Sequence, residues 1–299
     1  MFTLHQRAQF SAYKEAREYF ANNLNLLVEL EKHLTQTLVD LITAEKQNIK
    51  TDYDEASYLF PFWQNYPPLA RGRSPIGDQY PWIEVGEQTV AKHLNYQIKK
   101  VFPQWRHPGI PSGSDGRVLI AGKDIERILK GKTQSAWLFY DVKSVGPRDE
   151  AEHAVMSHTQ VSGAGVWNAH HDGIQNPLMT AKGKRREHAF YPNLPPIYVL
   201  SDGTVAPVLT TVVKPVYSMP SINDDSEIET GQPLKKIVVA SIPNGLLLDS
   251  LYLPQHPGLL FPGKDDKKKE KNHPHKMRAR ICFETLRQIA SWRVQTILF

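Results

Sequence analysis

The periodicity of apolar residues changes after residue 101, and this change constrains the fold of the chain more than any other feature. Before it, apolar residues recur at helical spacing, which predicts helices over 9–20, 24–49 and 82–101. From Arg117 onward, short apolar or alternating runs predict strands over 118–120, 135–145, 197–219, 235–242 and 277–283. The run 197–219 contains two strands joined by a turn at 201–203. Helices followed by strands predict an α/β fold with a mixed β-sheet flanked by helices.

Neither an internal repeat nor a clean linker divides the chain, so we expect a single domain over residues 1–299. Within it we expect N-terminal helices over about 1–50, a core over about 80–150, and a further sheet with a basic C-terminal region over about 190–290. Apolar residues make up 40% of the chain and charged residues 22%, which excludes a mainly disordered protein. Because Cys282 is the only cysteine, intramolecular disulfides are excluded as well.

The sequence also bears on location and partners. The first residues lack the continuous apolar segment of a leader peptide, and no apolar run approaches the ~20 residues that a membrane span requires. We therefore expect a soluble cytoplasmic protein with no membrane partner. The net charge of +5 permits a polyanionic partner such as nucleic acid.

The apolar run 135–145 contains two charged residues, Asp141 and Lys143. They are two residues apart, so in a strand both side chains project from the same face. Charges inside an apolar run are costly unless they are paired or bind something. One interpretation is an edge strand with a structural Asp–Lys pair on its solvent face. The other is a catalytic pair.

Asp115 favours the catalytic interpretation because it lies in a turn just before the strand predicted at 118–120. An acidic residue entering one strand and an Asp-x-Lys on its neighbour are typical of the PD-(D/E)xK nucleases, although Ser114 stands where the motif usually has proline. Two carboxylates supply the oxygen ligands that Mg²⁺ prefers, and the lysine can orient the attacking water. A third carboxylate is expected from the helix over 82–101, where Glu84 and Glu87 are candidates and Glu87 is favoured.

The C-terminal region is basic, with nine Lys or Arg against four Asp or Glu between Lys264 and Arg287. The lysine run within 267–271 is either a set of phosphate contacts or a solvated loop. Arg278 and Arg280 share one face of the predicted strand over 277–283, at a spacing that lets both reach into a DNA groove. Arg pairs with guanine and Asp with cytosine, so these residues, with Lys264 and Asp266 nearby, are suited to G·C pairs.

The chain resembles the type II restriction endonucleases of the BglI type. The resemblance extends from about Asp52 to Arg280. It is carried by these ordered blocks: PFWQNYPPLARG (61–72), PWIEVGE (81–87), DVKSVGPRD (141–149), QVSGAG (160–165), LPPIYVLSDGTVAPV (194–208), SIPNGL (241–246) and FPGKDD (261–266).

The resemblance implies a restriction-endonuclease-like core in which Asp115, Asp141 and Lys143 form the active site with Mg²⁺. It places the base-reading residues on Asp149, Lys264, Asp266, Arg278 and Arg280. It further implies double-stranded DNA as substrate, cut at an interrupted palindrome of GCC, spacer and GGC to leave 5′-phosphate ends and 3′ overhangs. A palindrome implies a homodimer.

Two alternative functions fit the same residues. One is another PD-(D/E)xK nuclease that acts in repair or junction resolution, and substrate choice would distinguish it. The other is a non-catalytic, sequence-specific DNA-binding protein in which Asp141 and Lys143 form only a structural pair. There, Mg²⁺ would change nothing covalent.

Overall fold

The computed structural model describes residues 4–58, 82–110, 112–144, 152–168, 173–217, 234–262 and 277–299. Its longer helices are α1 (Leu4–Asn22), α2 (Leu24–Ala44), α3 (Lys46–Tyr58) and α5 (Trp82–Val101). Shorter helical segments are α6 (Lys123–Ile128), η2 (His158–Gln160), α7 (Gly245–Leu247), η4 (Leu248–Tyr252), α8 (Leu253–Gln255), α10 (Phe283–Ile289) and η6 (Ser291–Arg293).

Five strands form the path of the main sheet, in the order β1 (Gly116–Ala121), β2 (Ser135–Val142), β9 (Val205–Tyr217), β10 (Leu234–Ile242) and β13 (Val294–Leu298). A sixth strand, β8 (Ile197–Val199), pairs with the start of β9 through the turn that the sequence predicts. Strands β2 and β9 are parallel and the other pairs antiparallel, so the sheet is mixed. This confirms the predicted fold class.

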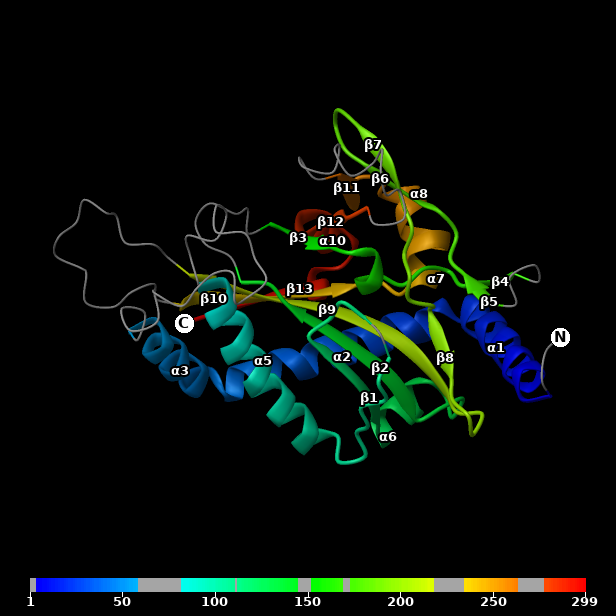
Figure 1. Cartoon of the computed structure of the whole chain (residues 1–299), viewed down its shortest axis with the longest axis horizontal. Helices are drawn as coiled ribbons and strands as arrows, with labels where there is room; N and C mark the ends of the chain where they lie inside the picture. Colours follow the sequence, from blue (N-terminus) through cyan, green and yellow to red (C-terminus); the bar gives the residue numbers. More distant parts are fainter. Residues whose placement is uncertain are drawn as a thin grey trace.

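A smaller sheet lies above the main one in Figure 1, in the order β11 (Leu260–Pro262), β12 (Ala279–Cys282) and β3 (His153–Met156). Lys214 of β9 is buried and donates a hydrogen bond to the carbonyl of His153, so it ties the main sheet to this small sheet. Two further pairs of short strands are β4 (Val166–Asn168) with β5 (Gly173–Gln175), and β6 (Met179–Lys182) with β7 (Glu187–Phe190).

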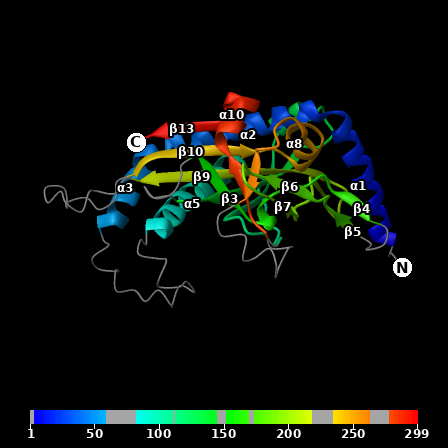
Figure 2. The same ribbon diagram turned by 90° about the horizontal axis from the view of Figure 1, so that it is seen from above.

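Burial on both faces explains why β2 is apolar along most of its length. Leu138 and Tyr140 join the large core that includes the helices, whereas Trp137 and Phe139 join a second cluster on the other face. Helix α2 packs along β9, β10 and β13, and α5 packs on β2 and β9. In both Figure 1 and Figure 2, α1 and the C-terminal Phe299 lie at opposite ends of the molecule.

The sequence prediction was wrong at one helix boundary and incomplete for several short strands. The helix predicted over 24–49 is two helices, because the backbone of Glu45 leaves the helical range (φ −94°, ψ 5°). The carboxylate of Glu45 accepts a hydrogen bond from Gln97 of α5, a tertiary contact that the local sequence pattern does not predict. Strands β3 to β7 and β11 escaped prediction because runs of three or four residues are too short to show a period. Strand β13 of the main sheet was not predicted either.

Candidate active site

The pairing of β1 with β2 brings Asp115 and Asp141 together. The two strands are antiparallel, with Gly116 opposite Tyr140. Extending this register by one residue sets Asp115 opposite Asp141, where cross-strand side chains are close neighbours. Gly116 permits this pairing, because a Cβ at that position would overlap the Tyr140 ring. The predicted convergence of the two aspartates is therefore a consequence of strand register.

Asp141 is a buried carboxylate with a charged partner. It is 3% exposed, and its Oδ2 lies 2.5 Å from Nζ of Lys143, whose side chain is 26% exposed. Burial raises the pKa of Asp141 to about 6, because the charged form loses solvation; Lys143 opposes this rise and the nearby Asp115 adds to it. The lysine side chain is thus partly exposed while the carboxylate beside it is buried.

Asp115 is held by the backbone of the strand opposite. Its Oδ2 accepts a hydrogen bond from the Val142 N–H at 2.6 Å, next to Asp141 in the chain. Helix α5 closes on the same end of β2 at Gly86, where a Cβ would overlap Oγ of Ser144. Glu87 is the next residue of this helix after Gly86. Its side chain and that of Glu84 lie outside the described part of the structure.

Sequence reasoning missed one residue that contacts the site. Gln160 is 5% exposed, and its Nε2 donates to Asp141 Oδ1 at 2.8 Å and to the carbonyl of Gly113 at 2.9 Å. The available signal was its position at the head of the QVSGAG block. That block marks a resemblance but does not say what its glutamine touches.

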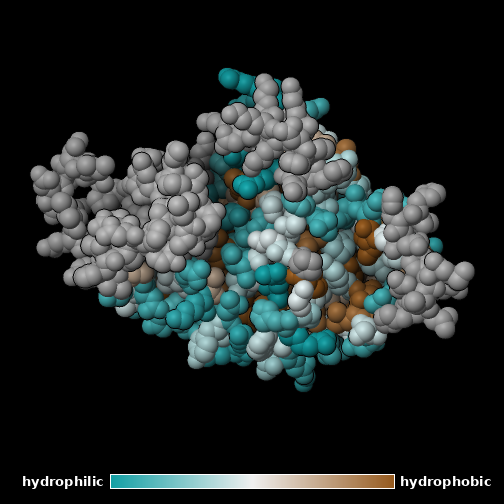
Figure 3. Space-filling model, viewed as in Figure 1, coloured by the Kyte–Doolittle hydropathy of each residue, from teal (hydrophilic) through white to brown (hydrophobic). Residues whose placement is uncertain are grey.

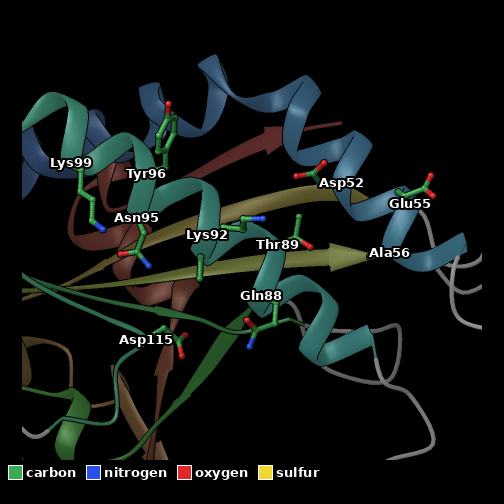
Figure 4. A pocket seen from close by; sticks show the side chains of 11 residues that line it. Asp52, Glu55, Ala56, Gln88, Thr89, Lys92, Asn95, Tyr96, Lys99 and Asp115 are labelled. Atoms are coloured by element: carbon green, nitrogen blue, oxygen red, sulfur yellow. The ribbon is translucent and has the colours of Figure 1, made fainter. Parts of the chain in front are cut away.

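A cavity of about 1000 Å³ borders Asp115 between α3 and α5 (Figure 4). Most of the residues that line it are polar or charged in type: Asp52, Glu55, Gln88, Thr89, Lys92, Asn95, Tyr96, Lys99 and Asp115, with Ala56 and Ala91. The surface over α3 and α5 is predominantly hydrophilic on this face of the molecule (Figure 3). Asp115 therefore lies at the edge of this hollow, whereas the buried Asp141 does not line it.

The carboxylates suit a hard divalent cation. Asp115 and Asp141 place carboxylate oxygens close together, and Oδ2 of Asp141 has the Lys143 ammonium as its neighbour. Like charges this close are unfavourable unless a cation or a proton offsets them. No group of three or more His, Cys, Asp or Glu side chains within the described ranges could hold a metal ion. A complete cation site would therefore need water or further ligands beside these two.

Arg278 and Arg280 lie where the predicted alternation places them. Met277, Ala279 and Ile281 are buried, Arg278 is exposed and Arg280 is partly exposed. Arg280 stands opposite Val155 of β3 in the small sheet. The other predicted base readers, Asp149, Lys264 and Asp266, and the lysine run after them lie outside the described residues.

Comparison with known proteins decides the family. The family described as restriction endonuclease BglI matches residues 8–297 of this chain. The chain belongs to the BglI family of restriction endonucleases. The type II restriction enzyme BglI of Bacillus subtilis is 41% identical over 278 residues, which cover 90% of this chain and 91% of that enzyme.

Solved structures agree with this assignment. The crystal structure of BglI bound to its DNA recognition sequence has a TM-score of 0.86 and 39% identity, covering 100% of this chain and 99% of that one. Tetrameric SfiI bound to cognate DNA has a TM-score of 0.60 at 13% identity, covering 91% and 84%, and this likeness shows the fold alone.

The BglI family assignment confirms the predicted family, the restriction-endonuclease-like fold and the enzyme class, a type II restriction endonuclease. It favours that hypothesis over a repair nuclease and over a non-catalytic DNA-binding protein. No helix in the described part of the chain has the length and apolar character needed to cross a bilayer.

Proposed function

We propose that this chain is a Mg²⁺-dependent endonuclease that cuts both strands of DNA at a G·C-rich interrupted palindrome. The observation that carries the proposal is the convergence of Asp115, Asp141 and Lys143 at the end of the β1–β2 pair. Membership of the BglI family supports it. Its DNA substrate would place its action in the cytoplasm.

In this proposal Asp115 and Asp141 hold the cation. Bound there, Mg²⁺ would polarise the scissile phosphate and lower the pKa of a bound water. Lys143 can donate to that water or to a non-bridging phosphate oxygen, because its side chain is partly exposed beside Asp141. As the water attacks phosphorus it releases a proton to solvent, the P–O3′ bond breaks, and O3′ takes up a proton from solvent. The products are a 5′-phosphate and a 3′-hydroxyl.

Sequence recognition is assigned to the small sheet and the segments beside it. Arg278 and Arg280 on the solvent-facing side of β12 are suited to guanine edges, and Asp149, Lys264 and Asp266 complete the proposed reader set. We propose a GCC-spacer-GGC site cut to leave 3′ overhangs, as the resemblance implies. One active site in each chain cuts one strand, so a palindrome calls for a homodimer.

The first experiment is digestion of a plasmid of known sequence, with Mg²⁺ and with EDTA. Discrete fragments that appear only with Mg²⁺ are expected, and mapping their ends gives the site and the overhang. A plasmid that contains such sites and stays intact in both lanes would contradict the proposal. Cleavage restricted to branched or damaged DNA would indicate a repair or junction nuclease instead.

Lys143→Ala tests the chemistry. We expect it to abolish cleavage and to leave binding to a specific duplex in EDTA unchanged, because the lysine acts on the attacking water. Lys50→Ala is the matched control, since it also removes a lysine from an ion pair, here with Asp54 on the surface of α3. Wild-type cleavage by the Lys143 variant would show that the assignment is wrong.

Arg278→Ala tests base reading. Loss of one bidentate guanine contact should cost about 1–3 kcal/mol of discrimination at a single base pair, about 5- to 150-fold in relative affinity. The measurement is competition binding with duplexes altered one base pair at a time. Arg127→Ala, which removes an exposed arginine paired with Asp124 on α6, is the control and should change no preference. A uniform loss across all sequences would indicate a phosphate contact instead.

A further inference from the structure

The side-chain amide of Gln160 has all its hydrogen-bonding atoms engaged. Nε2 donates to Oδ1 of Asp141 and to the carbonyl of Gly113, at 2.8 and 2.9 Å. Oε1 accepts from the backbone N–H of Ser157 at 2.9 Å. A buried amide saturated in this way has one orientation, because rotating it would exchange donor and acceptor and break its bonds.

Local sequence sets the position of this amide. Ser157 and Gln160 form a capping box around η2. The Ser157 side chain accepts from the backbone N–H of Gln160, and the Gln160 side chain accepts from the backbone N–H of Ser157. The loop of Gly113 packs directly on this turn, since a Cβ there would lie 2.6 Å from Oγ1 of Thr159. Contacts that do not involve Asp141 therefore already hold the Gln160 side chain in place.

The three partners of Gln160 belong to three different parts of the site. Gly113 lies two residues before Asp115, and Asp141 lies near the end of β2. Ser157 directly follows β3, the strand that pairs with β12 and its Arg280. One amide therefore connects Asp141, and the loop that leads to Asp115, to the small sheet proposed to read the bases.

We propose that Gln160 is a positioning residue that sets the orientation of the Asp141 carboxylate and aligns it with the base-reading sheet. The terminal torsion of an aspartate is broad, so its carboxylate needs an external partner to hold it. Gln160 engages Oδ1 and leaves Oδ2 to Lys143, and the same carboxylate would hold the cation in the proposed function. This inference rests on the proposed function, because it concerns the same carboxylate.

Gln160→Met tests the inference, because methionine keeps the length of the side chain and removes all three hydrogen bonds. We expect the single-turnover rate constant at saturating DNA and Mg²⁺ to fall at least tenfold, since small misplacements at a reacting centre are costly. Binding to the specific duplex in EDTA should stay within about threefold. Calorimetric titration of the free protein with Mg²⁺ should show weaker binding, a readout independent of cleavage.

Asn176→Leu is the matched control. Asn176 also uses its side-chain amide for three bonds, from the Gly165 N–H and to the carbonyls of Pro192 and Leu194, none of which belongs to the proposed active site. We expect it to lower the melting temperature as Gln160→Met does, with an unchanged rate constant below the transition. An equal loss of rate in both variants would reduce Gln160 to a structural role and overturn the inference.

Two further outcomes separate this inference from the proposed function. If the wild type and Lys143→Ala behave as proposed but Gln160→Met cleaves at the wild-type rate, only the role of Gln160 is wrong. If the wild type does not cleave, the proposed function itself fails. Should Gln160→Met not fold, Gln160→Glu keeps the acceptor for Ser157 and replaces the donor to Asp141. Wild-type Mg²⁺ binding and cleavage by that variant would also overturn the inference.

Discussion

At the scale of single residues, the absence of a side chain matters as much as its presence. Gly116 stands directly opposite Tyr140 and leaves room for the Tyr140 ring to cross the strand pair. Asp115 directly precedes Gly116, so the path of the β1 backbone sets its position. Its hydrogen bond from the Val142 N–H spans the two strands and so depends on their normal spacing in the sheet. The geometry of the proposed metal site therefore depends on a neighbour that carries no functional group.

Gly116→Ala should damage both stability and activity. The added methyl group overlaps the buried Tyr140 ring, and overpacking of this kind costs about 1–3 kcal/mol. We expect a lower free energy of unfolding by urea titration and slower cleavage, because Asp115 is displaced with the strand. Gly109→Ala is the control, since a Cβ there meets no atom within 4 Å. A Gly116 variant with wild-type stability would show that the strand pair adapts freely.

At the scale of elements, the turn between β8 and β9 shows how a local signal specifies a long strand. The chain reverses over 201–203, and the N–H of Gly203 donates to the carbonyl of Leu200. Gly203 has a φ of +82°, a conformation that costs other residues energy. Strand β9 starts two residues later and pairs with β2 and β10, so this turn leads directly into the central strand of the sheet.

Gly203→Ala should therefore lower the free energy of unfolding by about 1 kcal/mol, through backbone strain alone, since a Cβ there meets open space. Gly203→Asn should cost less, because asparagine tolerates positive φ. Thermal denaturation of the two variants beside the wild type measures both effects. If the alanine variant is no less stable than the asparagine variant, strain at this turn does not contribute.

At the scale of the whole molecule, one buried ion pair joins the two ends of the chain. Nη2 of Arg293 in η6 lies 2.8 Å from Oε2 of Glu31 in α2, and both residues are at most 1% exposed. Glu31 also accepts from the backbone N–H of Asn244 at 2.5 Å. Burial raises the pKa of Glu31 and Arg293 opposes that rise. We propose from these contacts that residues 1–299 fold as a single unit.

Arg293→Met should cost about 3–5 kcal/mol of stability, because it leaves a buried carboxylate without its counter-charge. The folded state of the variant favours the protonated form of Glu31, whose pKa is then raised further. Its stability should accordingly decrease as pH rises above the ordinary carboxyl range. Urea unfolding at several pH values measures this, and a single transition is expected. A loss of stability that grows toward low pH would contradict the argument.

Combining Glu31→Leu with Arg293→Met is the control for that prediction. The double variant replaces the ion pair with apolar side chains and should recover much of the loss. The Asn244 N–H would then lack its acceptor, so we expect the double variant to stay about 1–3 kcal/mol below the wild type.

The sequence by itself determined the elements whose physics is local. Helical spacing predicted α5 with its bounds, alternation predicted the buried and exposed faces of β12, and the turn at 201–203 predicted the β8–β9 hairpin. The candidate site residues Asp115, Asp141 and Lys143 were named from residue type and order along the chain. Their resemblance to a nuclease motif supplied the chemistry, and the BglI family assignment agrees with it.

Only the tertiary structure decided which atoms meet. At the break between α2 and α3, Glu45 contacts Gln97 of α5, and the burial that raises the pKa of Asp141 comes from packing of distant segments. Gln160 follows Asp141 by nineteen residues and reaches it through a turn whose place is set by strand pairing. Spacing along a chain encodes local geometry, whereas contacts of this kind follow from the register and packing of whole elements.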